Sequence, residues 1–243
     1  MWLGFSVTGA FIGATAALVV GLALSLIPLA PLFRAARGAT HAVALGQEET
    51  RFFLLASVIM LGYAALTNID SVAARALLSP DDAGAYAAAI TMAKVVLFAP
   101  IAVGFILPER TARAHARGED TDRALFAALG FVIVTSGAVA AAYLVAPAVL
   151  TRVVVGDQYP LTAALIGPYA ALLNALLSLW LAHFIGRGEM RFGIVLAIAV
   201  VGEVAAISAS ASDAAALVRV MLAMAVATQG AAVLTYVIER RHR

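Results

Sequence analysis

Long apolar runs constrain this chain more than any other feature of its sequence. Residues 2–33 contain no Asp, Glu, Lys or Arg, and further apolar runs recur up to the C-terminal tail. A run of about 20 apolar residues is what an α-helix needs to cross the hydrocarbon core of a bilayer. Only 12% of the 243 residues are charged, whereas soluble domains carry about 25%. The sequence therefore predicts an all-α, polytopic integral membrane protein.

The breaks between apolar runs predict about seven transmembrane helices. They are expected at about 2–33, 52–78, 80–107, 124–150, 161–185, 192–210 and 214–238. We expect a single helix over 1–33, a polar connector over 34–51 and a six-helix lobe over 52–243. Pro100 lacks an N–H and is expected to kink the third helix. Gly167-Pro168 is expected to interrupt the fifth, and a proline kink is the commoner explanation for such a pair.

The arginines predict an orientation. Connectors after the first, third and fifth helices, together with the C-terminal tail, hold twelve of the sixteen basic residues. The opposite connectors hold only Arg75 and Arg152. By the positive-inside rule the C-terminus is cytoplasmic and the N-terminus outside. An outside N-terminus without a signal peptide is unusual, and we expect that earlier helices are missing from this chain.

A turn after the second helix gives a clear helix start. Ser79 is expected to cap the third helix, with Pro80 at its first position and Asp81 and Asp82 in its first turn. Oxygen and negative charge suit a helix start because its free N–H groups and its dipole are positive there. The second and third helices should therefore form a tight hairpin.

Two charges lie in this hairpin where hydrocarbon is expected. At 1.5 Å per residue, Asp70 lies about 13 Å and Lys94 about 21 Å from the turn. Charge within a transmembrane span is costly and often marks a functional site. The two side chains either pair with one another, or Lys94 faces a watery cavity as a point cation suited to a phosphate or other anionic head group. The sequence leaves both alternatives open.

Other polar residues also interrupt the apolar runs. Glu203 and Arg219 each lie eight residues from Ala211, the centre of the last hairpin, and should form an ion pair at matching depth. Hydrogen bonds between helices account for most residues such as Asn68 and Asn174. The candidates for lining a substrate cavity are Lys94, Asp70, Asn68 and Asn174.

Patterns typical of catalysis are absent from the sequence. The chain has no cysteine, which excludes disulfides and thiolate metal sites. It contains no HExxH, GxSxG, Walker or GxGxxG pattern and no acidic pair at metal-ligand spacing within a span. We therefore expect neither an enzyme nor a bound cofactor or metal. The positive-inside topology accounts for the positions of the arginines, so these residues do not indicate a nucleic-acid partner.

Three segments of the chain carry a family resemblance. They are TNIDSVAARALLSPDDAGAYAAAITMAKVVLFAP with the following Pro108-Glu109-Arg110, VVVGDQYPLTAALIGPYAALLNALL, and FIGRGEMR. Over about 50–243 the chain resembles the polysaccharide exporter, or lipid-linked oligosaccharide flippase, branch of the multidrug/oligosaccharidyl-lipid/polysaccharide flippase superfamily. The resemblance places Lys94 on a basic position of the family and Asp70 on its Asn-x-Asp position.

The resemblance implies a two-lobed transporter with a central cavity. This chain would supply the second lobe, preceded by the last helix of a first lobe that is missing. The expected substrate is an undecaprenyl-pyrophosphate-linked saccharide, moved to the outer leaflet, and the expected location is a plasma (bacterial inner) membrane. The expected partners are the bilayer and either a separate first lobe or a second copy of the chain.

Three other functions remain as alternatives. A drug/cation antiporter of the same superfamily is the nearest. A non-transporting membrane scaffold of a glycan assembly complex would share the same topology. An intramembrane glycosyl- or acyltransferase is a weaker alternative, because such enzymes usually carry acidic or histidine catalytic residues in a loop.

Overall fold

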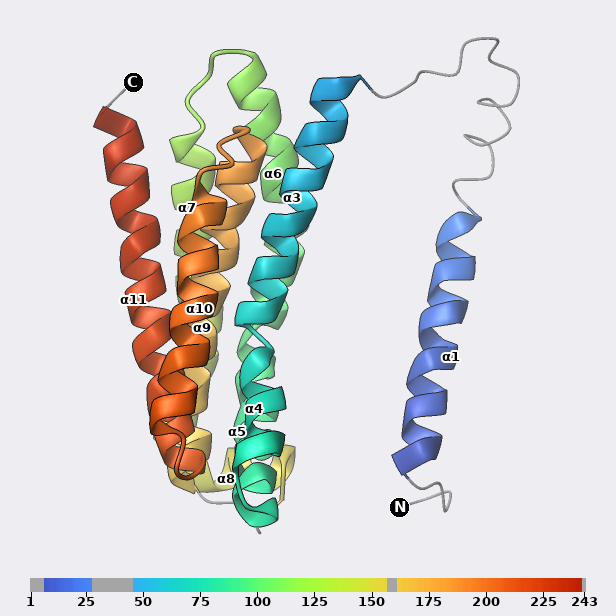
Figure 1. The fold of residues 1–243 in the computed structure, drawn as a ribbon, viewed down its shortest axis with the longest axis vertical. Coiled ribbons are helices and arrows are strands. Elements are labelled where there is room, and N and C mark those ends of the chain that lie inside the picture. The colour runs from blue at the N-terminus through green and yellow to red at the C-terminus, as the bar shows by residue number, and fades with distance from the viewer. Residues whose placement is uncertain (1–6, 28–45, 157–160, 242–243) are drawn as a thin grey trace. The chain divides into compact units, whose positions relative to one another are not determined.

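The computed structural model describes residues 7–27, 46–156 and 161–241, and these residues form helices and no strand (Figure 1). The predicted all-α class is confirmed for this part of the chain. The chain divides into two compact units, Met1–Glu49 and Thr50–Arg243. The first unit contains α1 (Val7–Leu26). Most of the expected connector, up to residue 45, lies outside the described residues.

The second unit is a helical bundle. Its helices are α3 (Gln47–Leu66, which begins just before the unit boundary), α4 (Ile69–Leu77), α5 (Pro80–Val96), α6 (Phe98–Ala116), α7 (Asp122–Val145), α8 (Pro147–Val154), α9 (Leu161–Gly186), α10 (Phe192–Ser210) and α11 (Ala214–Arg241). Within the described residues, four helical stretches are long and apolar enough to cross a membrane: Gln47–Leu77, Asp122–Val145, Phe192–Ser210 and Ala214–Arg241. Helices of this length and apolar composition indicate a membrane protein. The count of seven spans and the orientation stay predictions.

Helix α9 lies at the centre of the bundle, packed against α5, α6, α7 and α11. A Cβ on Gly167 would lie 3.0 Å from the carbonyl oxygen of Ala89 in α5, and one on Gly186 would lie 2.8 Å from that of Pro108 in α6. Glycine at both positions lets the backbones approach closely. The helix continues without a break through Gly167-Pro168, so the expected interruption there is wrong. This glycine serves a close helix contact.

A break that the sequence reading did not expect lies at Thr67–Asn68, between α3 and α4. The Asn68 side-chain amide donates to the carbonyl of Ala64 at 2.8 Å, and the Thr67 hydroxyl donates to that of Tyr63 at 2.9 Å. Asn and Thr side chains compete in this way with the regular helical hydrogen bonds. The expected single helix over 52–78 is therefore two helices.

The expected disturbance at Pro100 occurs as a second break, at Leu97 between α5 and α6. Proline has no N–H to donate to the carbonyl four residues earlier, which is that of Val96. The buried hydroxyl of Ser136 in α7 donates to this carbonyl instead, at 2.8 Å. The freed backbone group is thereby satisfied inside the bundle.

The start of α5 follows the sequence prediction. Ser79 is its N-cap and accepts a hydrogen bond from the backbone N–H of Asp82 at 3.2 Å, and Pro80 is the first helical residue. Behind this hairpin lies an apolar cluster of mostly small and aliphatic residues, together with Tyr86 and Met221, from α4, α5, α10 and α11. The cluster fixes the hairpin against the last two helices.

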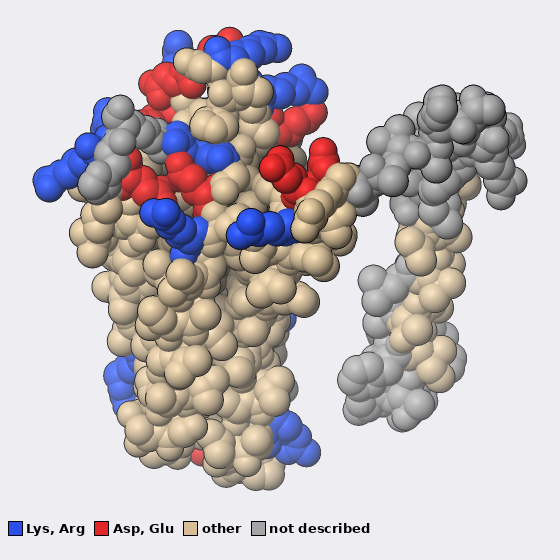
Figure 2. Space-filling model, turned by 45° about the horizontal axis from the view of Figure 1, so that its top comes forward, with Lys and Arg blue, Asp and Glu red and all other residues tan. Residues whose placement is uncertain are grey.

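Charged side chains of the second unit gather at one end, which we call the charged end (Figure 2). Here α3 and α7 begin and α6, α9 and α11 end. The middle of the unit exposes large apolar side chains, such as Phe105 at 79% and Val134 at 70%. An apolar belt next to a charged end is what a bilayer-embedded bundle presents to its surroundings.

Candidate functional site

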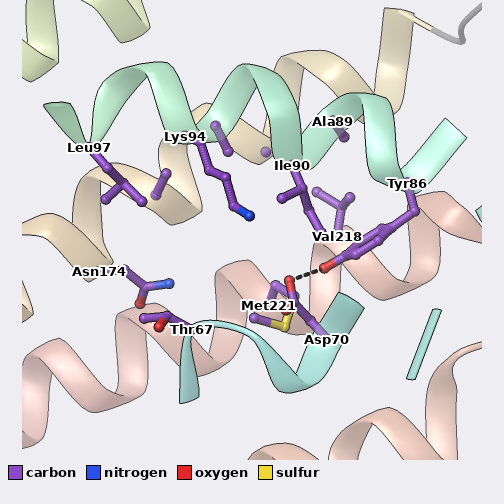
Figure 3. Close-up of a pocket in the computed structure, with 13 residues that line it drawn as sticks. Thr67, Asp70, Tyr86, Ala89, Ile90, Lys94, Leu97, Asn174, Val218 and Met221 are labelled. Atoms are coloured by element: carbon purple, nitrogen blue, oxygen red, sulfur yellow. Dashed lines mark hydrogen bonds between the residues drawn. The ribbon is translucent and has the colours of Figure 1, made fainter. Parts of the chain in front are cut away.

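A small cavity lies between α4, α5, α9 and α11, with walls that include Asp70, Tyr86, Lys94 and Asn174 (Figure 3). We call it the interior cavity. Its volume is about 60 Å³, enough for a few water molecules, since water occupies roughly 30 Å³ per molecule in the liquid. Both helix breaks reach it, because Thr67 and Leu97 also line it.

Asp70 is buried at the cavity wall, with 6% of its surface exposed. The hydroxyl of Tyr86 donates to its Oδ2 at 2.6 Å, and the backbone N–H of Ser71 donates to its Oδ1 at 2.7 Å. The break at Thr67–Asn68 makes Asp70 a first-turn residue of α4. The positive dipole end of this new helix favours the carboxylate.

Lys94 is the counterpart of Asp70 on α5. The break at Leu97 places it in the last turn of α5, where the negative dipole end favours a cation. Its exposed side chain points into the space between Asn174 and Asp70 (Figure 3). No described residue forms an ion pair or hydrogen bond with its ammonium. Of the two alternatives that the sequence left open, the Asp70–Lys94 ion pair is not formed: the two charges interact electrostatically without an ion-pair contact, and Tyr86 is hydrogen-bonded to Asp70.

Asn174 and Asn68 differ in their position relative to the interior cavity. Asn174, on α9, lines the interior cavity, and its backbone carbonyl accepts a hydrogen bond from Tyr63 at 3.0 Å. Asn68 is exposed at the helix break and is absent from the lining of that cavity. Three of the four residues named from sequence thus meet at one cavity, and Asn68 has a local backbone role.

Glu203 of α10 adds a second buried carboxyl, with 1% of its surface exposed. It interacts electrostatically with Asp70, and its Oε1 has no hydrogen-bond partner among the described residues. The expected ion pair with Arg219 is wrong, since Arg219 is exposed and interacts with Asp213 outside the core. Equal distance from a hairpin turn sets the depth of two residues but leaves their rotation about the helix axes undetermined.

Sequence reasoning missed Tyr86, although a usable signal existed. Asp70 lies eight residues before Leu78 and Tyr86 eight residues after it, so the two lie at matching depth on adjacent antiparallel helices. Here the rotation is also favourable, because Tyr86 is buried at 2% exposure and faces α4. The missing information was again which face of each helix points inward.

A second polar cluster lies at the charged end. Asp122, at the start of α7, has Oδ1 4.0 Å from Nε2 of His183 and Oδ2 3.7 Å from Nε of Arg240. Close by, Arg187 and Glu189 form an ion pair at 2.6 Å. We call these five residues the charged-end cluster. They join α7, the end of α9 and the end of α11.

Comparison with known proteins gave no assignment for this geometry. No protein family, curated protein or solved structure matched the chain. Within the described residues, no group of three His, Asp or Glu side chains is arranged to hold a metal ion.

Proposed function

We propose that this chain is one lobe of a membrane flippase, and that Lys94 binds the anionic head group of a lipid-linked saccharide. The observation that carries the proposal is the exposed, unpaired ammonium of Lys94 within an apolar bundle. A cation at this depth is too costly to leave in hydrocarbon. Lys94 therefore faces water or a partner surface.

The two helix breaks support the same proposal. Irregular backbone at membrane depth is tolerated where it is buried in protein or lines a water-filled cavity. Thr67 and Leu97, one from each break, both line the interior cavity. Transporters commonly bind substrate where broken helices present their ends. The two helix breaks that place Asp70 and Lys94 therefore favour a transporter over a protein that is only anchored in the membrane.

The chemistry of the cavity favours an anionic, oxygen-rich head group. A lysine ammonium is a point cation that suits phosphate, and the Asn174 amide offers donors and an acceptor for phosphate or saccharide oxygens. At about 60 Å³ the cavity is too small for a pyrophosphate-linked saccharide. To hold such a ligand the cavity would have to widen, with a second protein surface forming its other wall. A first lobe or a second copy of the chain would supply that surface, since alternating access needs two halves.

The proposal is tested with a charge-matched pair of variants. Lys94→Gln and Arg219→Gln each remove one cation, and Arg219 is exposed away from the interior cavity. With the full chain in nanodiscs, we expect Lys94→Gln to weaken binding of an undecaprenyl-pyrophosphate-linked saccharide about tenfold, equivalent to about 1.4 kcal/mol. Arg219→Gln should leave binding unchanged. Equal effects of the two variants would contradict the proposal.

One observation favours a second candidate function, a drug/cation antiporter. Asp70 and Glu203 bring two buried carboxyl groups together, which suits a cationic ligand. In that case Asp70→Asn would abolish binding of a cationic amphiphile, and Lys94→Gln would leave it intact or strengthen it. The flippase proposal expects the opposite ranking, with Lys94 dominant and an anionic ligand preferred.

A further inference from the structure

An apolar groove adjoins the interior cavity. It has a volume of about 430 Å³ and lies between α3, α6 and α9. The face of α6 that lines it presents Pro100, Gly104 and Pro108 at intervals of four residues. None of the three has a long side chain, and a Cβ added at Gly104 would meet nothing within 4 Å. The groove thus follows from the small side chains along one helix face.

The lining of the groove offers almost no polar group to a ligand. Its hydroxyls belong to Thr67, Tyr63 and Ser178. Each donates its hydrogen to a backbone carbonyl: Thr67 to Tyr63 at 2.9 Å, Tyr63 to Asn174 at 3.0 Å and Ser178 to Ala175 at 2.7 Å. The remaining lining is aliphatic, aromatic or glycine. Such a groove matches a hydrocarbon chain.

The groove and the interior cavity adjoin one another at Thr67 and Leu97, which line both. On one side of this junction lie Lys94, Asp70 and Asn174. On the other side the groove runs along α3 and α6 toward the charged end. A cationic pocket beside an apolar groove complements an anionic amphiphile, whose charged head group and hydrocarbon chain would each meet a matching surface.

We propose that the groove binds the hydrocarbon chain of the same amphiphile whose anionic head group lies at Lys94. This inference rests on the proposed function, and it adds the position and direction of the chain. The head would lie within the bundle while the chain lies between α3 and α6, in the leaflet next to the charged end. The ligand therefore enters sideways between these two helices.

The groove is tested by filling it. Gly104→Leu places a side chain in the groove, and the space around the added Cβ allows the helix to fold. Gly130→Leu is the matched control, since Gly130 is exposed on α7, outside the groove, and its Cβ would also meet nothing within 4 Å. Gly104→Ala adds only a methyl group and should give an intermediate effect. Thermal unfolding of each variant checks that the bundle is intact.

The probes are inorganic pyrophosphate, dimethylallyl pyrophosphate and farnesyl pyrophosphate, bound to the full chain in nanodiscs after subtraction of empty nanodiscs. In the unmodified chain we expect affinity to rise about tenfold from the shortest to the longest probe, because more methylene groups are buried. Gly104→Leu should remove this rise and leave pyrophosphate binding unchanged. Gly130→Leu should keep the rise.

Three outcomes overturn the inference in distinguishable ways. If Gly104→Leu keeps the rise with chain length while Lys94→Gln weakens every probe, the groove is not the chain site, but the proposed head-group site stands. If farnesol binds as tightly as farnesyl pyrophosphate and Lys94→Gln has no effect, the groove holds any bilayer hydrocarbon and the proposed function fails as well. If Gly130→Leu also removes the rise, the effect is not specific to the groove.

Discussion

The bundle contains two polar clusters, and they differ in whether their charged side chains form ion pairs. At the charged end, Arg187 and Arg240 each lie within 4.0 Å of a carboxylate, and Arg187 is only 9% exposed. In the interior, Lys94 forms no ion pair within the described residues, although its charge interacts with that of Asp70, and Glu203 Oε1 has no hydrogen-bond partner there. Paired charges hold helices together, whereas charges without an ion pair in an apolar bundle commonly mark a functional site. The first cluster is structural and the second is the candidate site.

The largest expected loss of stability follows from breaking the charged-end cluster. Arg187→Ala removes a donor from Glu189 and from the Thr121 hydroxyl, which accepts from Arg187 at 3.0 Å. Removing one partner of this largely buried ion pair should lower the free energy of unfolding by about 3 kcal/mol. Chemical denaturation in detergent measures this loss of unfolding free energy. Arg191→Ala, an exposed arginine of the same loop, is the control and should change stability by less than about 0.5 kcal/mol.

A smaller loss is expected at the one well-bonded acid of the interior. Tyr86→Phe removes the hydroxyl that donates to Asp70 at 2.6 Å. A hydrogen bond to a charged group contributes about 2 kcal/mol, and the variant should lose about that much. In an Asp70→Asn background the same substitution should have a smaller effect. An equal loss in both backgrounds would show that Tyr86 acts by packing alone.

The break at Leu97 gives a third and still smaller effect. Ser136→Ala should destabilise the chain by about 1 kcal/mol, because it leaves the buried carbonyl of Val96 without its donor. Pro100→Ala restores a backbone N–H at the position that normally donates to this carbonyl. The effect of Ser136→Ala should therefore shrink in the Pro100→Ala background. A constant effect would rule out the proposed compensation.

The smallest effect is expected at Asp213, which lies in the turn between α10 and α11 and belongs to neither cluster. It accepts a hydrogen bond from the backbone N–H of Ala216 at 2.7 Å, and this bond lowers the pKa of its carboxyl. A lowered pKa stabilises the fold above the unfolded pKa of about 3.9, and the contribution disappears as the pH falls through the folded value. The difference in melting temperature between the wild type and Asp213→Asn should therefore shrink from pH 7 toward pH 3. A constant difference would exclude ionisation as its source.

The sequence predicted those features that depend on chain order and depth. Apolar run lengths predicted the helical class, and Ser79-Pro80 predicted the start of α5, because capping is a local property. Disturbance at Pro100 was also predictable from its missing N–H. These inferences use only neighbouring residues, and they place Asp70 and Lys94 on one hairpin.

The sequence reading failed where rotation about a helix axis decides the contact. Asp70 is hydrogen-bonded to Tyr86 and forms no ion pair with Lys94, and Glu203 is buried while Arg219 is exposed. In a membrane span nearly every position is apolar, so hydrophobic periodicity carries little information on which face points inward. The Thr67–Asn68 break was missed because it depends on side-chain hydrogen bonds that compete with an otherwise regular helix.

The central claim is that Lys94 faces water or a ligand rather than lipid, and thiol labelling tests it directly. The natural chain has no cysteine, so single cysteines can be introduced without other changes. Lys94 lies 14 residues after the start of α5 at Pro80, and Phe131 lies 14 residues before the end of α7 at Val145, which puts both about 21 Å from those helix ends. Phe131 is 52% exposed on the apolar belt and serves as the depth-matched control.

The measurement is the reaction rate of a water-soluble, membrane-impermeant thiosulfonate with the full chain in liposomes. Only a thiolate in contact with water reacts, because a thiol surrounded by hydrocarbon stays protonated. We predict that Lys94→Cys reacts about tenfold or more faster than Phe131→Cys. Equal, slow rates at the two positions would contradict the claim and would place Lys94 against lipid.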